Sequence, residues 1–209
     1  MTDLTYLFDP LCGWCYGAAP ALRALVEAGH AVTLAPTGLF AAPGRAMDPE
    51  FAAYAWGADQ RIAAMTGQEF SGRYRADVLD RPGAPFDSTP ATLALTAVWL
   101  GDPAREAEAL GAIQRARYVD GQDICDASVL ATLWRGLGLP EAAERAAAPD
   151  ASLRTAAAGR VRAAQALMAR HGLSGVPALL AGTRNPLPNG LLFGARPALL
   201  AAVAASAGP

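Results

Sequence analysis

Two cysteines close to the N-terminus, Cys12 and Cys15, are separated by a Gly-Trp dipeptide. Thiols at this spacing can close to a disulfide and reopen, which moves two electrons to or from another disulfide. The same spacing supplies two of the four ligands that a structural zinc ion requires. The other residues of types that bind zinc are single and scattered: His30, Cys125 and His171. The motif therefore predicts redox chemistry rather than a metal site.

The position of this Cys-Gly-Trp-Cys motif assigns different roles to the two thiols. It follows an apolar run over 4–8 that predicts a buried strand, and it opens an apolar stretch over 12–28 that predicts a helix kinked by Pro20. Free N–H groups and the positive end of the helix dipole stabilise a thiolate at the first turn. We therefore expect Cys12 to attack a substrate disulfide and Cys15, one turn deeper, to resolve the mixed disulfide.

The segments at both ends of the chain predict an α/β domain. A second apolar run over 31–36 completes a strand–helix–strand unit with the first. Apolar runs return over 177–181 and 191–193, and a terminal helix is expected over 196–205. Motif residues at the end of the first strand lie where open α/β sheets place their chemistry.

A helical block separates these two pieces of the chain. From 45 to about 170 no run is convincing as a strand, and several segments open on Asp or Thr, three times followed by Pro, which is typical of a helix N-terminus. The stretch 67–87 carries the weakest pattern and is expected to be a loop with some irregular structure. The expected helices cover 48–66, 89–100, 102–118, 126–137, 141–147 and 151–171.

The segment FDPLCGWCYGAAP over 8–20 resembles the active-site segment of DsbA-like thioredoxin-fold proteins, within the subgroup described as predicted protein-disulfide isomerases. Three further motifs resemble parts of that family: Ser88-Thr89-Pro90-Ala91, Gly121-Gln122-Asp123-Ile124 and Gly175-Val176-Pro177. The resemblance covers essentially the whole chain. It implies a thioredoxin fold with an all-helical insertion between the βαβ half and a C-terminal ββα half. The thioredoxin-like domain would comprise residues 1–44 and 172–209, and the insertion residues 45–171.

The resemblance also implies further site residues. Pro177 is expected to be cis and, with Val176, to lie beside Cys12, where its loop can pair with an extended substrate. Trp14 is expected either to contact substrate or to pack on the insertion. Asp9 either tunes the cysteines or only shapes a turn. Without a histidine between the cysteines, we expect a redox potential in the reducing half of the range from about −270 to about −120 mV.

Composition excludes several classes of function. All 17 basic residues are arginine, which leaves no lysine for a Schiff base or a phosphate-binding loop, and a net charge of −2 does not favour nucleic acid or an anionic membrane as partner. No stretch approaches the about 20 apolar residues of a membrane span. We expect no cofactor, no signal peptide and a cytoplasmic location. Cys125 is expected to be a small packed residue rather than a third redox thiol.

Three hypotheses of function follow, and the oligomeric state stays open. The first is a thiol–disulfide oxidoreductase that acts on protein thiols or disulfides, or on a small thiol such as glutathione. The second is a glutathione-dependent transferase or isomerase of small molecules, which typically carries serine at the reactive position. The third is a chaperone-like binding protein. Replacing Cys12 with Ser separates the third hypothesis, because only an enzyme would lose its activity.

Overall fold

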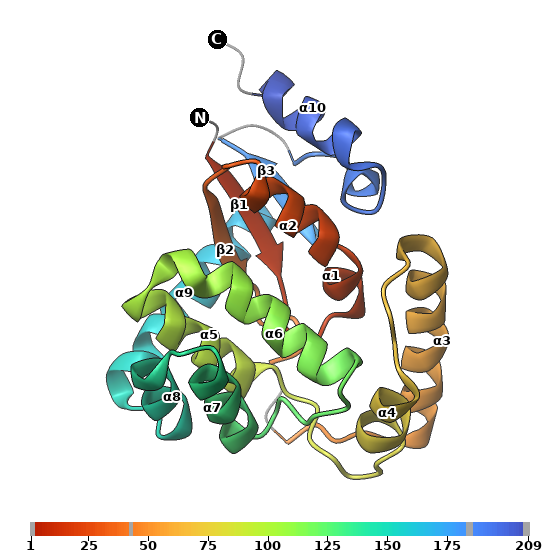
Figure 1. Ribbon diagram of the computed structural model, residues 1–209, viewed down its shortest axis with the longest axis vertical. Coiled ribbons are helices and arrows are strands. Elements are labelled where there is room, and N and C mark those ends of the chain that lie inside the picture. Colours follow the sequence, from red (N-terminus) through yellow and green to blue (C-terminus); the bar gives the residue numbers. More distant parts are fainter. Residues whose placement is uncertain (1–2, 42–43, 183–185, 207–209) are drawn as a thin grey trace.

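The computed structural model is built around a small mixed sheet (Figure 1). Among the described residues the sheet has three strands, β1 Leu4–Phe8, β2 Val32–Pro36 and β3 Ala178–Ala181, in the order β2-β1-β3. β2 runs parallel to β1 and β3 antiparallel to it. The crossover between β1 and β2 is the predicted strand–helix–strand unit. The described residues are 3–41, 44–182 and 186–206.

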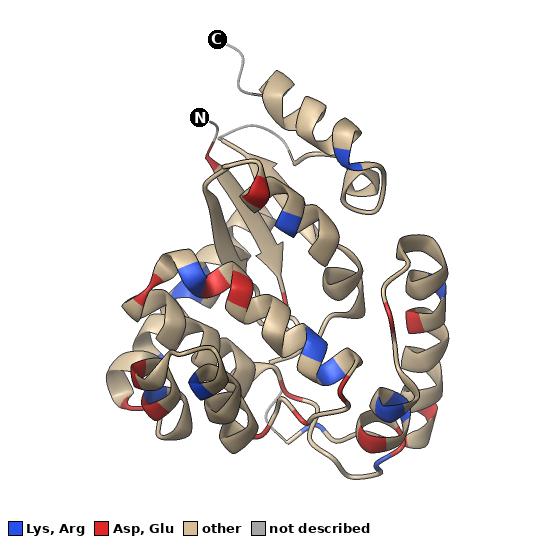
Figure 2. Cartoon of the chain, viewed as in Figure 1, with Lys and Arg blue, Asp and Glu red and all other residues tan. Residues whose placement is uncertain are grey.

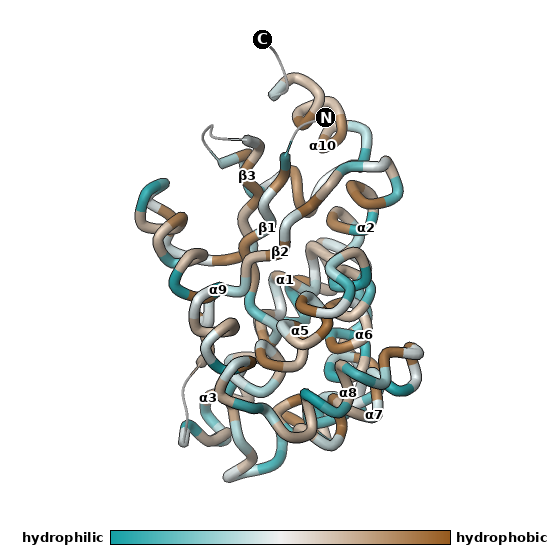
Figure 3. Tube along the Cα trace, turned by 90° about the vertical axis from the view of Figure 1, so that its left-hand side faces the viewer, coloured by the Kyte–Doolittle hydropathy of each residue, from teal (hydrophilic) through white to brown (hydrophobic). Residues whose placement is uncertain are grey.

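The two faces of the sheet pack against different helices. Leu7 and Leu180 belong to a small apolar cluster that also contains Ala164 of α9 (Ala151–Arg170). Tyr6 and Phe8 point into the main core on the other face. Figure 3 shows α9 and α2 on opposite sides of the strands. The strands carry no charged residue, and the charges lie on helices and loops (Figure 2). Both faces of β1 are therefore covered, which explains its continuous apolar sequence.

The predicted kinked helix over 12–28 is two helices, α1 Gly13–Gly17 and α2 Ala19–Glu27. Pro20 has no N–H, so it cannot donate to the carbonyl of Tyr16 one turn earlier. The side-chain amide of Gln68 donates to that carbonyl instead, at 3.1 Å. The break is thus compensated by a residue of the helical block.

The helical block follows the predicted boundaries closely. Asp48 and Asp126 cap their helices as expected, each accepting a backbone N–H through its side chain. Ser88, not Thr89, occupies the cap position of α5, and its hydroxyl makes no cap hydrogen bond. The helices are α3 Pro49–Thr66, α5 Thr89–Gly101, α6 Glu106–Tyr118, α7 Ala127–Gly136, α8 Pro140–Ala147 and α9, followed after β3 by α10 Arg196–Ser206. Among the described helices none is long and apolar enough to cross a membrane.

One expectation about local structure is confirmed and another was wrong. The stretch 67–87 is loop with some irregular structure: Ser71 caps the short helix α4 Gly72–Tyr74, which continues into a π-helical turn, η1 Arg75–Leu79, with a buried apolar side, and the rest is loop and turn. The run 191–193 does not form a second C-terminal strand. It falls in the 3-10 turn η3 Asn189–Leu192 and the residue after it. A Pro-Asn-Gly sequence favours a turn over a sheet ladder, and among the described residues β3 forms an isolated bridge to Pro186 instead of a ladder with a fourth strand.

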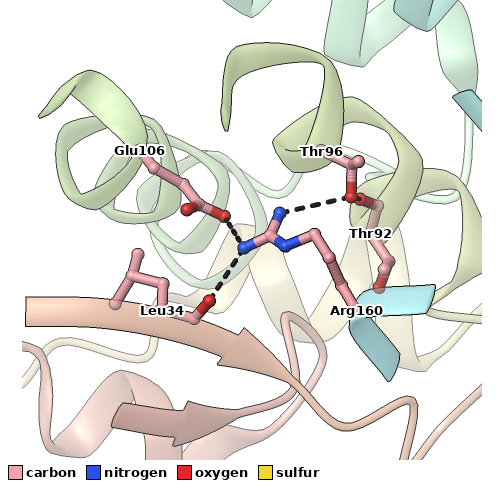
Figure 4. A network of polar contacts seen from close by, with 5 residues as sticks. All are labelled: Leu34, Thr92, Thr96, Glu106 and Arg160. Carbon is pink, nitrogen blue, oxygen red and sulfur yellow. Dashed lines mark hydrogen bonds and ion pairs between the residues drawn. The ribbon is translucent and has the colours of Figure 1, made fainter. Parts of the chain in front are cut away.

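A buried ion pair holds the helical block against the edge strand (Figure 4). Arg160 of α9 pairs with Glu106 of α6 at 2.6 Å and donates to the carbonyl of Leu34 on β2 at 2.8 Å. Its guanidinium also donates to the hydroxyl of Thr96 on α5 at 3.3 Å. One side chain thereby joins a strand of the sheet to three helices, and it covers part of an open sheet edge.

Candidate active site

The two thiols of the motif lie in different environments at the start of α1. Cys12 is the N-cap residue of this helix, and its sulfur accepts a hydrogen bond from the backbone N–H of Cys15 at 3.4 Å. Cys15 is completely buried, whereas Cys12 retains a small exposed area. Burial, a hydrogen bond with Cys12 and the charge of Cys12 raise the pKa of the Cys15 thiol well above its usual value. Of the two cysteines, Cys12 is thus the one with exposed surface, and its role as the attacking thiol stays a prediction.

The loop before β3 borders the outer sulfur. The Cys12 thiol donates to the backbone carbonyl of Val176 at a sulfur–oxygen distance of 3.6 Å. The Val176–Pro177 peptide bond is cis. Because β3 pairs antiparallel with β1, the start of β3 lies beside the end of β1, where the motif begins. The sheet thus brings together two segments that are far apart in the sequence.

Trp14 lies half-buried between the two cysteines. Its ring makes an edge-to-face contact with Phe193, with centroids 5.4 Å apart. Phe193 follows η3, so this ring partner belongs to the C-terminal part of the α/β domain and not to the helical block. A contact between Trp14 and a substrate stays a prediction.

Asp9 is completely buried and connects three loops. Its carboxylate accepts hydrogen bonds from the backbone N–H groups of Leu11 at 2.9 Å and Phe40 at 3.0 Å, and from the hydroxyl of Ser88 at 2.8 Å. Burial raises its pKa, and these hydrogen bonds oppose the rise. The Ser88 hydroxyl is thus used on Asp9, which explains why it does not cap α5. The contacts give Asp9 a positioning function, while tuning of the cysteines stays a prediction.

Two buried tyrosines that the sequence analysis did not select hold the backbone of the motif. The hydroxyl of Tyr6 donates to the carbonyl of Cys15 at 3.3 Å, and that of Tyr118 to the carbonyl of Leu11 at 2.9 Å. Tyr6 lies in a strand predicted from its apolar character, and Tyr118 lies at the end of a helix, 107 positions after Leu11, so no local pattern identifies either.

A helix of the insertion packs directly on α1. A Cβ atom added at Gly13 would lie 2.3 Å from Oδ1 of Asp59, and one added at Gly17 would lie 2.5 Å from Cγ2 of Ile62. Gly13 and Gly17 are four residues apart and share one helix face. The four-residue spacing of these two glycines is the feature of the sequence that indicates this contact. Asp59, also absent from the sequence prediction, is thereby placed against the dipeptide between the cysteines.

The carboxyl of Asp59 is buried in a polar and aromatic environment. Its Oδ2 accepts a hydrogen bond from the hydroxyl of Tyr74 at 2.9 Å, and the side chain is 5% exposed. Burial raises the pKa of Asp59 to about 6, against the opposing effects of Tyr74 and of the Arg117 guanidinium. Asp59 therefore changes its charge within the range from pH 5 to 7.

The hydrogen bonds of the Cys125 thiol go to a loop of the helical block. Its thiol donates to the carbonyls of Pro85 and Asp87, both at 3.3 Å. Burial raises the pKa of Cys125 to about 11, so the thiol stays protonated near neutral pH. Within the ranges that the structure describes, no group of three or more His, Cys, Asp or Glu residues is arranged to hold a metal ion.

The thioredoxin-like fold and the paired thiols define an enzyme of the DsbA-like disulfide oxidoreductase class. The chain belongs to the DSBA-like thioredoxin domain family, whose model matches residues 4–202. The family inferred from the resemblance of segment 8–20 is thus confirmed.

Solved structures agree with this assignment. The chain is similar to the cytosolic disulfide reductase DsbM from Pseudomonas aeruginosa, with 36% identity and a TM-score of 0.86, covering 97% of both chains. The structure of DsbM with GSH gives 34% identity and a TM-score of 0.83, covering 97% of this chain and 98% of the other. A 2-hydroxychromene-2-carboxylate isomerase shares the fold at 17% identity and a TM-score of 0.62, covering 97% and 95%. The comparison with curated proteins finds no match.

Proposed function

We propose that the chain reduces disulfides through the Cys12–Cys15 pair, with glutathione as the small thiol with which the pair exchanges. The observation that carries this proposal is the placement of the Cys12 sulfur: it caps α1, accepts the N–H of Cys15 and lies against the carbonyl of Val176. A sulfur held at a helix N-terminus, with a second thiol one turn away, is equipped for attack followed by resolution.

The exchange proceeds in two substitutions at sulfur. The Cys12 thiolate attacks one sulfur of the substrate disulfide, a Cys12–substrate disulfide forms, and the other substrate thiolate leaves. Cys15 then loses its proton and attacks the Cys12 sulfur, which releases the second substrate thiol and leaves a Cys12–Cys15 disulfide. The charge and hydrogen bond of Cys12 that raise the pKa of Cys15 are lost in the mixed disulfide, so deprotonation of Cys15 becomes easier at the step that needs it.

The proposed direction, disulfide reduction, and the proposed thiol partner, glutathione, are supported by the DsbM structures and by the Gly-Trp dipeptide. DsbM is described as a cytosolic disulfide reductase, and one of its structures contains GSH. The Gly-Trp dipeptide contains no histidine to stabilise a reduced thiolate. Two molecules of glutathione would return the pair to the dithiol and leave as glutathione disulfide. We accordingly propose a cytoplasmic location, with Trp14, Val176 and Pro177 as the surface that contacts the substrate.

The test is the redox equilibrium of the pair in glutathione buffers, read by alkylation and peptide mass. The wild type and Cys125→Ser should form a reversible Cys12–Cys15 disulfide, with a potential near or below that of the cytosolic glutathione pool. Cys12→Ser should lose disulfide reductase activity, and Cys15→Ser should accumulate a glutathione adduct on Cys12. Reductase activity that survives Cys12→Ser would refute the proposal. A potential well above that of the pool would reverse the proposed direction.

A further inference from the structure

The helical insertion places one carboxyl group against the redox motif. Oδ1 of Asp59 occupies the space that a side chain at position 13 would take, 2.3 Å from the Cβ position of Gly13. Gly13 follows Cys12 directly, so a charge carried by α3 lies next to the residue that bears the attacking sulfur. Residue 13 can only be glycine while Asp59 keeps this position.

The charges around Asp59 do not balance when it is ionised. Arg117 of α6 is a buried cation, and its positive charge lowers the pKa of both Asp59 and Asp9. Nε of Arg117 has no hydrogen-bond partner in the part of the chain that the structure describes. Asp9 accepts three hydrogen bonds, which favour its ionised form. Ionisation of Asp59 therefore adds a negative charge to this cluster of one guanidinium and two carboxyl groups, next to Gly13.

We propose that Asp59 is a positioning residue that makes the Cys12–Cys15 pair a stronger reductant, because its ionised carboxylate opposes the Cys12 thiolate. An anion close to a thiolate destabilises the reduced form relative to the disulfide, in which neither sulfur is charged. Stabilisation of the reduced form is what makes a pair of this kind oxidising, so the opposite effect makes it reducing. The inference rests on the proposed function and adds to it a residue of the helical insertion.

The effect depends on pH with a defined sign. The groups that face Asp59 are Tyr74 of α4, Arg117 of α6 and, on α1, Gly13, the residue that follows Cys12. Because the pKa of Asp59 is raised to about 6, its carboxyl is neutral at pH 5 and ionised at pH 7.5. The negative charge next to Gly13 is therefore present at pH 7.5 and absent at pH 5.

The experiment compares the wild type with Asp59→Asn, and uses Asp77→Asn as the matched control because Asp77 is exposed on η1. The fully reduced proteins are alkylated with iodoacetamide, a neutral reagent that reacts with thiolates, and modification of Cys12 is followed by peptide mass. Asp59→Asn should react on the order of tenfold faster at pH 7.5 and within about twofold of the wild type at pH 5. Its equilibrium in glutathione buffers should shift toward the dithiol at pH 7.5. Asp77→Asn should match the wild type throughout.

Equal rates for Asp59→Asn and the wild type at pH 7.5 would overturn the inference. A change of the same size at both pH values would also overturn it, because a merely structural effect does not follow the ionisation of Asp59. If Asp59→Asn does not fold, Tyr74→Phe serves instead: loss of the hydrogen bond to Asp59 should move the pH at which Cys12 reactivity changes upward from about 6. An unmoved profile contradicts the inference.

The two proposals fail separately. Cys12 alkylation measures the influence of Asp59 even if the pair forms no reversible disulfide, in which case only the proposed function fails. A reversible disulfide whose equilibrium is unaffected by Asp59→Asn leaves the proposed function intact and removes this inference.

Discussion

At the scale of single residues, the type of residue at two positions of the site is explained by a contact with a residue that is distant in the sequence. Gly13 has no side chain, and the carboxyl of Asp59 occupies the space that a side chain would take. Ser88 looks like a helix cap and instead donates to the buried Asp9. In both cases the residue type is explained by a partner dozens of positions away, and in both cases that partner is a buried carboxyl group.

The pairing of Gly13 with Asp59 predicts a strong coupling in a double-mutant cycle. Gly13→Ala should destabilise the wild type by about 1–3 kcal/mol, because the new methyl group meets Oδ1 of Asp59. In an Asp59→Ala background the same change should cost less than about 1 kcal/mol. Urea unfolding of the four reduced proteins measures this. Gly111→Ala is the control, because Gly111 is exposed in α6 with open space around it, and it should be neutral or slightly stabilising. Additive costs would contradict the packing of α3 on α1.

At the scale of elements, the helical insertion is attached to the sheet at several separate contacts. α3 lies on the glycine face of α1, the N-terminus of α5 is tied to Asp9, and α9 reaches the edge strand through Arg160. The break between α1 and α2 is completed by Gln68, which also belongs to the inserted segment. The insertion thus supports the backbone of the redox motif as well as covering it.

Loss of Arg160 should weaken this attachment in a pH-dependent way. Arg160→Met leaves Glu106 buried without its cation, and breaking such a pair costs about 3–5 kcal/mol. The cost should be largest at pH 7.5 and smaller at pH 5, where Glu106 takes up a proton. Arg162→Met, exposed on the same helix, should be close to neutral. Urea unfolding at both pH values tests this, and an equal cost at pH 5 and 7.5 would argue against a charge left unpaired.

At the scale of the whole molecule, three buried carboxyl groups lie where the insertion meets the α/β domain. They are Asp9, Asp59 and Glu106, and burial raises the pKa of each of them. For Glu106 burial outweighs the attraction of Arg160 and raises the pKa to about 7. A carboxyl group with a raised pKa binds protons more tightly in the folded state than in the unfolded one, so its contribution to stability falls as pH rises.

The raised pKa of Glu106 sets the pH range over which its contribution to stability changes. Its contribution is fully present near pH 4.5 and below, and is lost as pH rises through about 7. The free energy of unfolding of reduced Glu106→Gln should therefore change less between pH 5 and 7.5 than that of the wild type, by about 1–3 kcal/mol. Glu108→Gln, exposed on the same helix, should keep the wild-type pH dependence. Parallel curves for the wild type and Glu106→Gln would show that the carboxyl does not titrate in this range.

Local patterns in the sequence determined a large part of this protein. The apolar runs, the Asp caps and the positions of proline predicted most helices and three strands, because periodicity and capping depend on residues only a few positions apart. The spacing of Cys12 and Cys15 at the end of a strand indicated their chemistry for the same reason. The contacts of Asp59, Ser88 and Arg160 were decided only by the tertiary structure. Each depends on segments that meet only after folding, and no local pattern in the sequence contains those meeting points.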